Sequence, residues 1–517
     1  MKKPRLAYYS DAHHFHAKRL DPPLNVKKLQ WPVDELVGTG VDLLVFGLGY
    51  GDVYFHQSKI GRVVGQEKEV WESFIDWRIM RMVKDAEAMG TDQVREVIRR
   101  GRETGMAVFP SLKLQDPAKP GSERCGWLKW KHLAEVCLGK PDNRFPNHGT
   151  EWVYDYANEL VRQEKKALVR EMLVDYEADG IELDFMFFPL YFRRDETEQG
   201  ITVMNEFVAE VREMANEIGE KQGRKIPIMA RVWHRREDNL TIGLDPEAWL
   251  KEGSVDLVAA QIPSLSMDTG NVEGRWLADA ANTAGAAAYV QLRAPMIEDE
   301  RARFPNIEMY RALSQTLQRQ GFAGMYLGYL PWPLGQDEYQ VLREMASPEG
   351  IARLDKRYFR PPRAKVPPYF APDESPLPLD LEEGKKATVN IVVADDLESA
   401  RRDGEMRQPV LTVTFRFFCV EDDVSIRFNG TAMPIDEAEI QKVSGGLLQR
   451  DGGTYWFRYR LDLDLLKRGE NIVEISLDKA TKSAGFARTV TGVEIHTRYK
   501  DFARPEGLGP ETIAPAF

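Results

Sequence analysis

The stretch DGIELDFMFFP, residues 179–189, decides the fold of this chain. Alternate side chains of a β-strand lie on the same face, so Leu183 and Phe185 share one face. Glu182 and Asp184 share the other face. The apolar face suits packing against helices, which leaves the two carboxylates pointing into the interior of a closed sheet. The stretch therefore predicts one strand of a parallel, helix-covered barrel.

Seven further runs of strand-like composition surround this stretch in the first 335 residues. They are RLAYYSD (5–11), VDLLVFGLGYGD (41–52), GMAVFPSLKLQD (105–116), IPIMARVWH (226–234), VDLVAAQIP (255–263), AAAYVQLRAP (286–295) and FAGMYLGYLPW (322–332). Segments with the apolar spacing of helices lie between most of them, as at 70–89, 159–176 and 201–221. Eight strands that alternate with helices predict a (β/α)₈ barrel. A doubly wound open sheet is the alternative, but it usually has fewer strands and a GxGxxG turn, which this sequence lacks.

The composition changes after the predicted barrel, which we place at residues 1–345 as the catalytic domain. Residues 346–383 are rich in proline, which is typical of a linker. Residues 384–500 carry short alternating runs separated by turn residues and no helical pattern, so they predict a β-sandwich. The last segment, 501–517, has few apolar anchors and predicts an extended or disordered tail.

The sandwich is interpreted as a structural domain that supports the barrel, with glycan binding as the alternative role. Tyr455, Trp456 and Tyr459 lie on one predicted strand, but alternation places Tyr455 on the face opposite Trp456. Rings in this pattern usually belong to the core of a sandwich.

Composition excludes several classes of protein. The 517 residues carry 70 Lys+Arg and 81 Asp+Glu, a net charge of −11, which argues against a nucleic-acid partner. No apolar run is long enough to cross a membrane. The three cysteines lack zinc-ligand spacing and do not form a disulfide framework. The N-terminus has no apolar signal segment, so the chain is expected to be cytoplasmic, or periplasmic or secreted if a signal has been removed.

Candidate site residues are sought at the carboxyl ends of the predicted strands, where (β/α)₈ barrels place their active sites. Loops are polar in any barrel, so part of this enrichment is automatic. The predicted substrate-binding residues at these ends are His14, Tyr50, Lys113, Asp116, Arg231, Trp233, His234, Gln261, Gln291, Tyr326 and Trp332.

The carboxylates Asp184, Glu182 and Asp11 are the predicted catalytic residues. A carboxylate buried in a barrel is costly unless it is paired or used, and Lys113 and Arg231 are the available cations. Asp184 is expected to act in catalysis or substrate binding, whereas Glu182 lies one layer deeper and is as compatible with a structural role. Asp11 is either the second carboxylate or a helix N-cap. The other candidates for the second carboxylate are Glu237, Asp238, Asp268 and Glu298.

The fourth-strand stretch resembles a motif of known carbohydrate-active barrels. DGIELDFMFFP is similar to the DGIxLD pattern of glycosyl-hydrolase-like proteins distantly related to glycoside hydrolase family ten, and RVWHRREDNLTIGLDPEAWLKEGSVDLV (231–258) is similar to the same group. The resemblance implies a carbohydrate-active barrel and a catalytic role for Asp184. The chitinase pattern D-G-x-D-x-D-x-E also aligns with this stretch, but Met186 stands where that family has its acid. Chitin hydrolysis assisted by the substrate is therefore not implied.

The leading hypothesis is a glycoside hydrolase that acts on a poly- or oligosaccharide through carboxylate catalysis, without a cofactor or metal. A cluster of cations would favour an acidic sugar. The first alternative is a catalytically idle barrel that binds glycan. The second is a metal-dependent hydrolase or aldolase that uses Asp11, His13, His14, His16 and His234.

Overall fold

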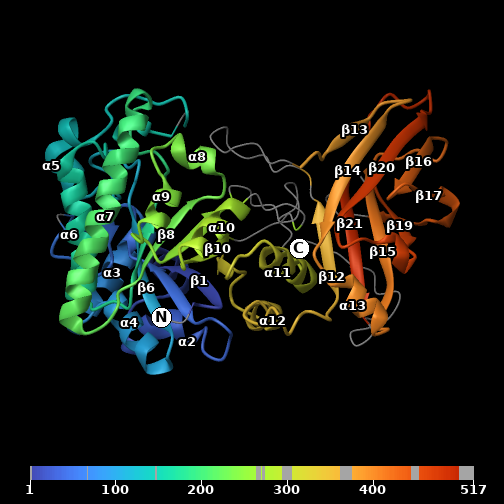
Figure 1. Ribbon diagram of the computed structural model, residues 1–517. Helices are drawn as coiled ribbons and strands as arrows, with labels where there is room; N and C mark the ends of the chain where they lie inside the picture. The colour runs from blue at the N-terminus through green and yellow to red at the C-terminus, as the bar shows by residue number, and fades with distance from the viewer. Residues whose placement is uncertain are drawn as a thin grey trace.

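The chain folds into a helix-wrapped barrel and a β-sandwich that lie side by side (Figure 1). The computed structural model describes residues 3–66, 68–145, 148–262, 269, 274–293, 305–360, 362, 375–443 and 453–499. Within these residues no helix combines the length and the apolar character that crossing a bilayer requires.

Eight parallel strands close into the barrel, which confirms the predicted (β/α)₈ fold and excludes the open sheet. The strands are β1 (Leu6–Asp11), β2 (Leu43–Gly47), β6 (Ala107–Lys113), β7 (Ile181–Asp184), β8 (Ile228–Trp233), β9 (Leu257–Gln261), β10 (Ala287–Arg293) and β11 (Gly324–Gly328). They follow one another in chain order around the barrel, and β11 pairs with β1 to close it. A small sheet of β3 (Gly49–Tyr50), β4 (Val53–Tyr54) and β5 (Arg62–Val63) follows β2.

Helices cover the outside of the barrel. They are α2 (Val26–Asp34), α3 (Phe74–Ala88), α4 (Gln93–Thr104), α5 (Trp127–Val136), α6 (Glu159–Val174), α7 (Thr197–Gln222), α8 (Arg236–Leu240), α9 (Pro246–Lys251), α10 (Arg275–Thr283), α11 (Ile307–Arg319) and α12 (Gln336–Glu344). Shorter turns are α1 (Ala12–His14), η1 (Phe15–Arg19), η2 (Thr150–Trp152) and η3 (Arg194–Glu196). Local signals set their ends: the Asp92 carboxylate accepts from the Arg95 amide at the start of α4, and Gly105, at φ 77°, ends it.

The barrel separates two apolar cores. The larger core lies between the strands and the helices and includes Leu183 and Phe185, as the alternation on β7 predicts. The smaller core fills the barrel interior, where Tyr9, Phe109 and Tyr289 pack among small side chains. Glu182 and Asp184 lie on this inner face of β7, so the polar side chains of the interior sit directly above packed apolar ones.

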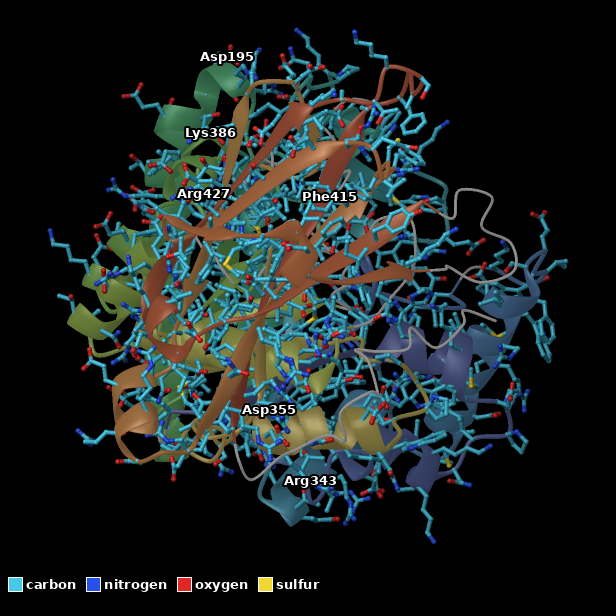
Figure 2. The ribbon with its side chains drawn as sticks, turned by 90° about the vertical axis from the view of Figure 1, so that its right-hand side faces the viewer. Asp195, Arg343, Asp355, Lys386, Phe415 and Arg427 are labelled. Carbon is cyan, nitrogen blue, oxygen red and sulfur yellow. The ribbon has the colours of Figure 1, made fainter. Side chains whose placement is uncertain are left out.

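Two antiparallel sheets form the predicted sandwich. One sheet contains β12 (Lys356–Arg360), β21 (Arg488–Tyr499), β15 (Met406–Arg416), β19 (Thr454–Arg460) and β18 (Glu439–Val443), with β13 (Leu379–Leu381) paired to β21. The other contains β14 (Lys386–Val393), β20 (Gly469–Lys479), β16 (Asp423–Phe428) and β17 (Thr431–Met433). The remaining helical turns are α13 (Leu397–Arg402), η4 (Ile435–Glu437) and η5 (Leu463–Leu465). Figure 2 looks onto this domain, with Phe415 on β15 and Arg427 on β16 labelled.

The predicted linker differs from the structure. Residues 346–383 contribute β12 and β13, both of which pair with β21, so part of the expected linker is sheet. The sequence did not predict these strands, because the segment between them is rich in proline. Tyr455 and Tyr459 pack with the sandwich core. The predicted tail, 501–517, lies outside the described residues.

Candidate active site

Asp11 lies at the carboxyl end of β1 and is held from two sides. Its Oδ2 accepts hydrogen bonds from the Tyr9 hydroxyl at 2.9 Å and from Lys113 Nζ at 2.8 Å. Its Oδ1 accepts from the His13 amide at 2.9 Å and caps α1, which confirms the N-cap role, whereas a catalytic role for Asp11 stays a prediction. Burial alone would raise the pKa of Asp11, but the Lys113 ammonium holds that pKa well below its usual range. Asp11 is therefore ionised at neutral pH.

Asp184 and Glu182 share the cation Arg231, whose strand β8 pairs with β7. Arg231 forms an ion pair with Asp184, and its Nε lies 3.9 Å from Glu182 Oε1. The Met186 amide donates to Asp184 Oδ1 at 2.8 Å. All three side chains are fully enclosed. Asp184 is thus an anion held against a cation at the carboxyl end of its strand.

Glu182 lies one layer deeper than Asp184 and is bound by two hydroxyls. Tyr326 donates to its Oε1 at 2.9 Å, and Ser111 donates to its Oε2. Burial raises the pKa of Glu182, and the Arg231 charge offsets only part of this rise. These contacts fit a structural role for Glu182, which ties three strands together across the interior.

A single chain of contacts joins these groups across the barrel. Lys113 reaches Asp11 from β6, Tyr9 bonds Asp11, and the Arg231 guanidinium lies 5.3 Å from the centre of the Tyr9 ring. Both cations of this network are therefore engaged by its three carboxylates, and the interior has no surplus of positive charge.

Several enclosed polar atoms beside this network lack a hydrogen-bond partner among the described residues. Neither Oε1 nor Nε2 of Gln291 has one, although the residue is 1% exposed. The same holds for Gln261 Oε1 and for Arg231 Nε and Nη1, whereas Arg231 Nη2 forms the ion pair with Asp184 Oδ2. Gln261 and Gln291 are opposite one another on β9 and β10. An unsatisfied buried polar atom costs about 1–3 kcal/mol, so this arrangement is suited to a polar ligand.

Aromatic side chains surround the carboxyl ends of β1, β2 and β11. The His14 ring lies 4.6 Å from the Tyr329 ring, and the Tyr50 ring lies 5.0 Å from that of His13. Burial lowers the pKa of His14 to about 4, so this imidazole is neutral at pH 7. Tyr329 has φ 54°, a strained conformation for a residue with a side chain, and such strain is frequent at functional sites.

Trp332 is the most exposed of the predicted site residues, at 39%. Its ring lies 5.9 Å from the Trp31 ring and 5.0 Å from the Arg19 guanidinium. It follows β11 and presents an accessible aromatic surface beyond the carboxyl end of that strand.

Asp116 belongs to a separate network that fastens the loops after β2 and β6. It accepts from the Ala118 amide at 2.6 Å and pairs with Arg124 at 3.1 Å. In the same network Lys165 bonds Asp52 at 2.9 Å, and Lys129 lies 3.5 Å from it. These contacts hold the two loops together, and the substrate-binding role of Asp116 stays a prediction.

Trp233 and His234 end β8 and lead into α8. The Trp233 amide donates to Asn239 Oδ1 at 2.9 Å, and the His234 carbonyl accepts from Trp276 Nε1 at 2.8 Å. These bonds fold the loop back against the strand end. Asp238, within α8, has its pKa raised by burial. The candidates Asp268 and Glu298 lie outside the described residues.

Three further residues at this site were not singled out from the sequence. Tyr9 and Ser111 precede Asp11 and Lys113 by two positions, so strand alternation places them on the same inner face. The Phe187 ring lies 4.5 Å from Lys113 Nζ and 5.5 Å from Arg124, where it joins the two networks. The sequence predicts Tyr329 as a ring at the end of its strand that could stack on a sugar, but it does not predict the positive φ of this residue.

The histidines after β1 do not form a metal centre within the described part of the chain. His16 is buried, and its Nδ1 bonds the Ala12 carbonyl at 2.9 Å. The group of potential metal ligands that does converge there consists of Glu308, Asp355 and His496, far along the chain from these histidines.

Comparisons with known proteins give no family assignment. No family model matches the chain, and no curated protein matches it. Solved structures that resemble it include a cycloisomaltooligosaccharide glucanotransferase from Paenibacillus sp., with 11% identity and a TM-score of 0.35 over 95% of this chain and 57% of that enzyme. The chain thus spans little more than half of that enzyme's length.

Two further similar structures are also carbohydrate-active enzymes. A maltogenic α-amylase from Thermotoga neapolitana has 11% identity and a TM-score of 0.39 over 91% of this chain and 99% of that one. A family 36 α-galactosidase from Geobacillus stearothermophilus has 14% identity and a TM-score of 0.38 over 96% of this chain and 56% of that one. At such low identities and TM-scores, the similarity assigns neither an activity nor a substrate to this chain. The resemblance to glycoside hydrolase family ten stays a prediction.

Proposed function

We propose that this protein is a glycoside hydrolase that cleaves a poly- or oligosaccharide at the carboxyl end of its barrel. The observation that carries the proposal is the set of enclosed polar atoms of Gln291, Gln261 and Arg231 without hydrogen-bond partners among the described residues, beside the carboxylates Asp184 and Asp11. The hydroxyls of a sugar both donate and accept hydrogen bonds. They can therefore accept from the guanidinium group and from the amide nitrogens, and donate to the amide oxygens.

We assign the roles from charge and position. Asp184 acts as the nucleophile or as the base that activates water. Asp11 is ionised and therefore unsuited to donate a proton, but it stabilises the positive charge that develops on the sugar ring in the transition state. Asp238 acts as the proton donor, because burial raises its pKa and it follows β8 on the same side of the barrel.

The charges favour a neutral sugar over an acidic one. Lys113 is bonded to Asp11, and Arg231 is paired with Asp184. A uronic or sulfated sugar would have to compete with these carboxylates for the same cations. The aromatic rings of Tyr329 and Trp332 are suited to pack on the C–H faces of a neutral ring.

The assignment of Asp238 as proton donor is tested by how the rate of hydrolysis depends on the leaving group. We expect Asp238→Asn to slow cleavage of oligosaccharides about a hundredfold or more, while hydrolysis of aryl glycosides with acidic phenols changes little, since these leave without protonation. Glu237→Gln is the matched control, because Glu237 is the exposed neighbour on the same short helix. Equal losses on both kinds of substrate would remove Asp238 from the proton-donor role.

A catalytically idle barrel that binds glycan is the second candidate. The full enclosure of Asp184 and its ion pair with Arg231 favour it, since a nucleophile must reach the substrate. Glycan binding by both the wild-type chain and Asp184→Asn, without hydrolysis by either, is the result that this candidate predicts.

A further inference from the structure

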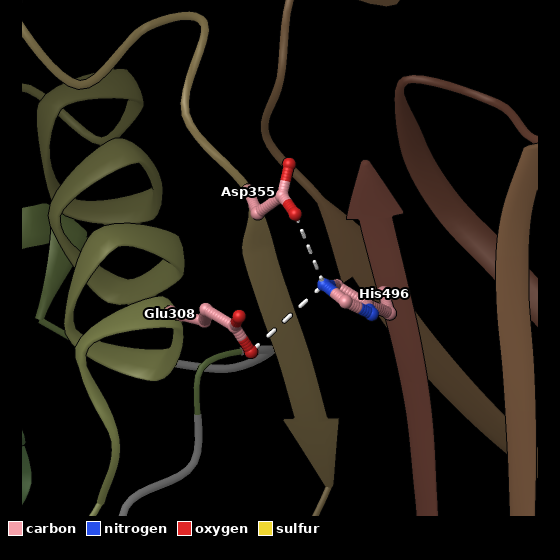
Figure 3. Close-up of side chains that lie close together, drawn as sticks. All are labelled: Glu308, Asp355 and His496. Atoms are coloured by element: carbon pink, nitrogen blue, oxygen red, sulfur yellow. Dashed lines mark ion pairs between the residues drawn. The ribbon is translucent and has the colours of Figure 1, made fainter. Parts of the chain in front are cut away.

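The contact between the barrel and the sandwich encloses three potential metal ligands (Figure 3). Glu308 lies on the barrel helix α11, Asp355 immediately before β12, and His496 on β21. His496 Nε2 lies 3.8 Å from Glu308 Oε2 and 3.8 Å from Asp355 Oδ2. The three ligand atoms all lie within 4.8 Å of one another.

These separations are too long for hydrogen bonds but suit ligands around one ion. A hydrogen bond from nitrogen to oxygen spans about 2.7–3.2 Å. Two ligands at about 2.15 Å from a tetrahedral ion, with an angle of about 109° between them, lie about 3.5 Å apart, which is slightly less than the two separations of 3.8 Å. His496 Nε2 is enclosed and has no hydrogen-bond partner among the described residues, although it points at both carboxylates. A buried nitrogen without a hydrogen-bond partner lowers the stability of the fold unless a ligand lies between it and the two carboxylates.

From this geometry we infer that Glu308, Asp355 and His496 bind a divalent transition-metal ion of the zinc type at the barrel–sandwich contact. One imidazole nitrogen and two carboxylate oxygens suit Zn²⁺ better than Mg²⁺ or Ca²⁺, which prefer oxygen ligands alone. The enclosed Nε2 of His496 can offer its lone pair to such an ion.

Neighbouring groups hold the two carboxylates in place. Arg357 Nε donates to Glu308 Oε2 at 2.8 Å, and the Tyr499 amide donates to Asp355 Oδ1 at 2.7 Å. Each carboxylate oxygen has two lone pairs, so Glu308 Oε2 can accept from Arg357 and still bind an ion. Arg357 also pairs with Glu494, which takes up part of its charge. The positive charges of Arg357 and Arg498 act on the His496 ring and oppose the binding of a cation.

The ion would connect the two domains. Its ligands come from a barrel helix and from two positions in the sandwich, so they meet only while the domains are in contact. Binding to the docked state alone raises the stability of that state in proportion to the occupancy of the site.

The test is a titration of the full-length protein with ZnCl₂ after treatment with EDTA and dialysis. We expect calorimetry to give one Zn²⁺ per chain and the melting temperature to rise by about 2 °C or more at saturation. His496→Gln and Asp355→Asn should each weaken binding at least tenfold. His132→Gln is the control, since the exposed His132 lies 3.7 Å from Glu135 on α5 and belongs to no group of three potential metal ligands within the described residues, so this variant should keep full binding.

The opposite results would overturn the inference. Absence of a one-to-one Zn²⁺ isotherm in the wild-type protein would do so, as would equal binding by His496→Gln. If the variants do not fold, X-ray absorption of the zinc-loaded wild type decides, since the site requires one imidazole and carboxylate oxygens around the metal. A spectrum without imidazole scattering would contradict it.

Discussion

At the scale of single residues, the barrel interior depends on charges that are buried in pairs. Asp11 has Lys113 and Asp184 has Arg231, and each pair joins different strands. Sequence alternation on the fourth strand was sufficient to predict that Glu182 and Asp184 point inward. It could not predict which cation each carboxylate would meet, because that depends on strand register: Arg231 lies opposite Asp184 on the paired strand β8.

Lys113→Met tests how far Asp11 depends on its partner. The substitution leaves the buried carboxylate with its hydrogen bonds from Tyr9 and the His13 amide but without a cation, so we expect a loss of about 3 kcal/mol in the free energy of unfolding. Urea denaturation followed by circular dichroism measures it. Lys140→Met, at an exposed position, should change stability by about 0.5 kcal/mol or less. A similar small effect for both variants would mean that Asp11 does not need the ammonium.

Glu182→Gln separates structure from catalysis at the deeper carboxylate. Replacing the acceptor of the Tyr326 and Ser111 hydroxyls should lower the free energy of unfolding by about 1–3 kcal/mol. The folded fraction should keep its turnover number within a few-fold, because Glu182 lies below the reacting layer. A hundredfold loss of turnover in a fully folded Glu182→Gln protein would instead place it in the catalytic machinery.

At the scale of elements, regular periodicity gave reliable predictions and irregular segments did not. The predicted helix at 159–176 corresponds to Glu159–Val174, and that at 201–221 lies within Thr197–Gln222. β12 and β13 were missed because prolines separate them and because strands this short have little pattern of their own. Their pairing with β21 is a tertiary contact that the local sequence does not encode.

Acid should weaken one connection between sandwich elements. Asp422, before β16, binds Arg488 of β21 through both oxygens. Burial would raise the pKa of Asp422, but the hydrogen bonds from Arg488 lower it to about 2. Because this pKa is lowered, the pair stabilises the fold above the unfolded value of about 3.9, and that contribution is lost as the pH falls towards 2.

The free energy of unfolding, measured from pH 5 to pH 2, tests the direction of this pH dependence. Asp422→Asn should be less stable than the wild type at pH 5, and the difference should shrink as the pH falls. Asp423→Asn changes an exposed neighbour and should follow the wild-type curve. A difference that stays constant over this range would show that ionisation of Asp422 does not contribute.

At the scale of the whole molecule, the sandwich is fastened to the barrel through α11 and β12. Arg357 bonds Glu308 of the helix and Glu494 of β21, so a single guanidinium serves both domains. Composition predicts a domain boundary near residue 345. It does not predict the contact between the domains, because the charged residues of that contact are spread over almost two hundred positions of the chain.

Arg357→Met tests whether the two domains unfold together. Removing the guanidinium leaves Glu308 and Glu494 without this partner, so we expect the single thermal transition of the wild type to separate into two. Differential scanning calorimetry makes the comparison. Arg343→Met, which changes an arginine of α12 in contact with the Tyr339 ring, should keep one transition. One transition in both variants would mean that other contacts couple the domains.

The central claim is that Asp184 carries glycoside hydrolysis, and the release of reducing ends from a panel of neutral, uronic and sulfated glycans tests it most directly. We predict that the wild type cleaves a neutral glycan and that Asp184→Asn loses at least about a hundredfold in rate while it still binds the same glycan. Asp179→Asn is the matched control, since Asp179 bonds the Val108 amide at the opposite end of the same strand and should leave the rate per folded molecule unchanged. Equal release by the wild type and Asp184→Asn, or no release from any glycan by the wild type, would contradict the account.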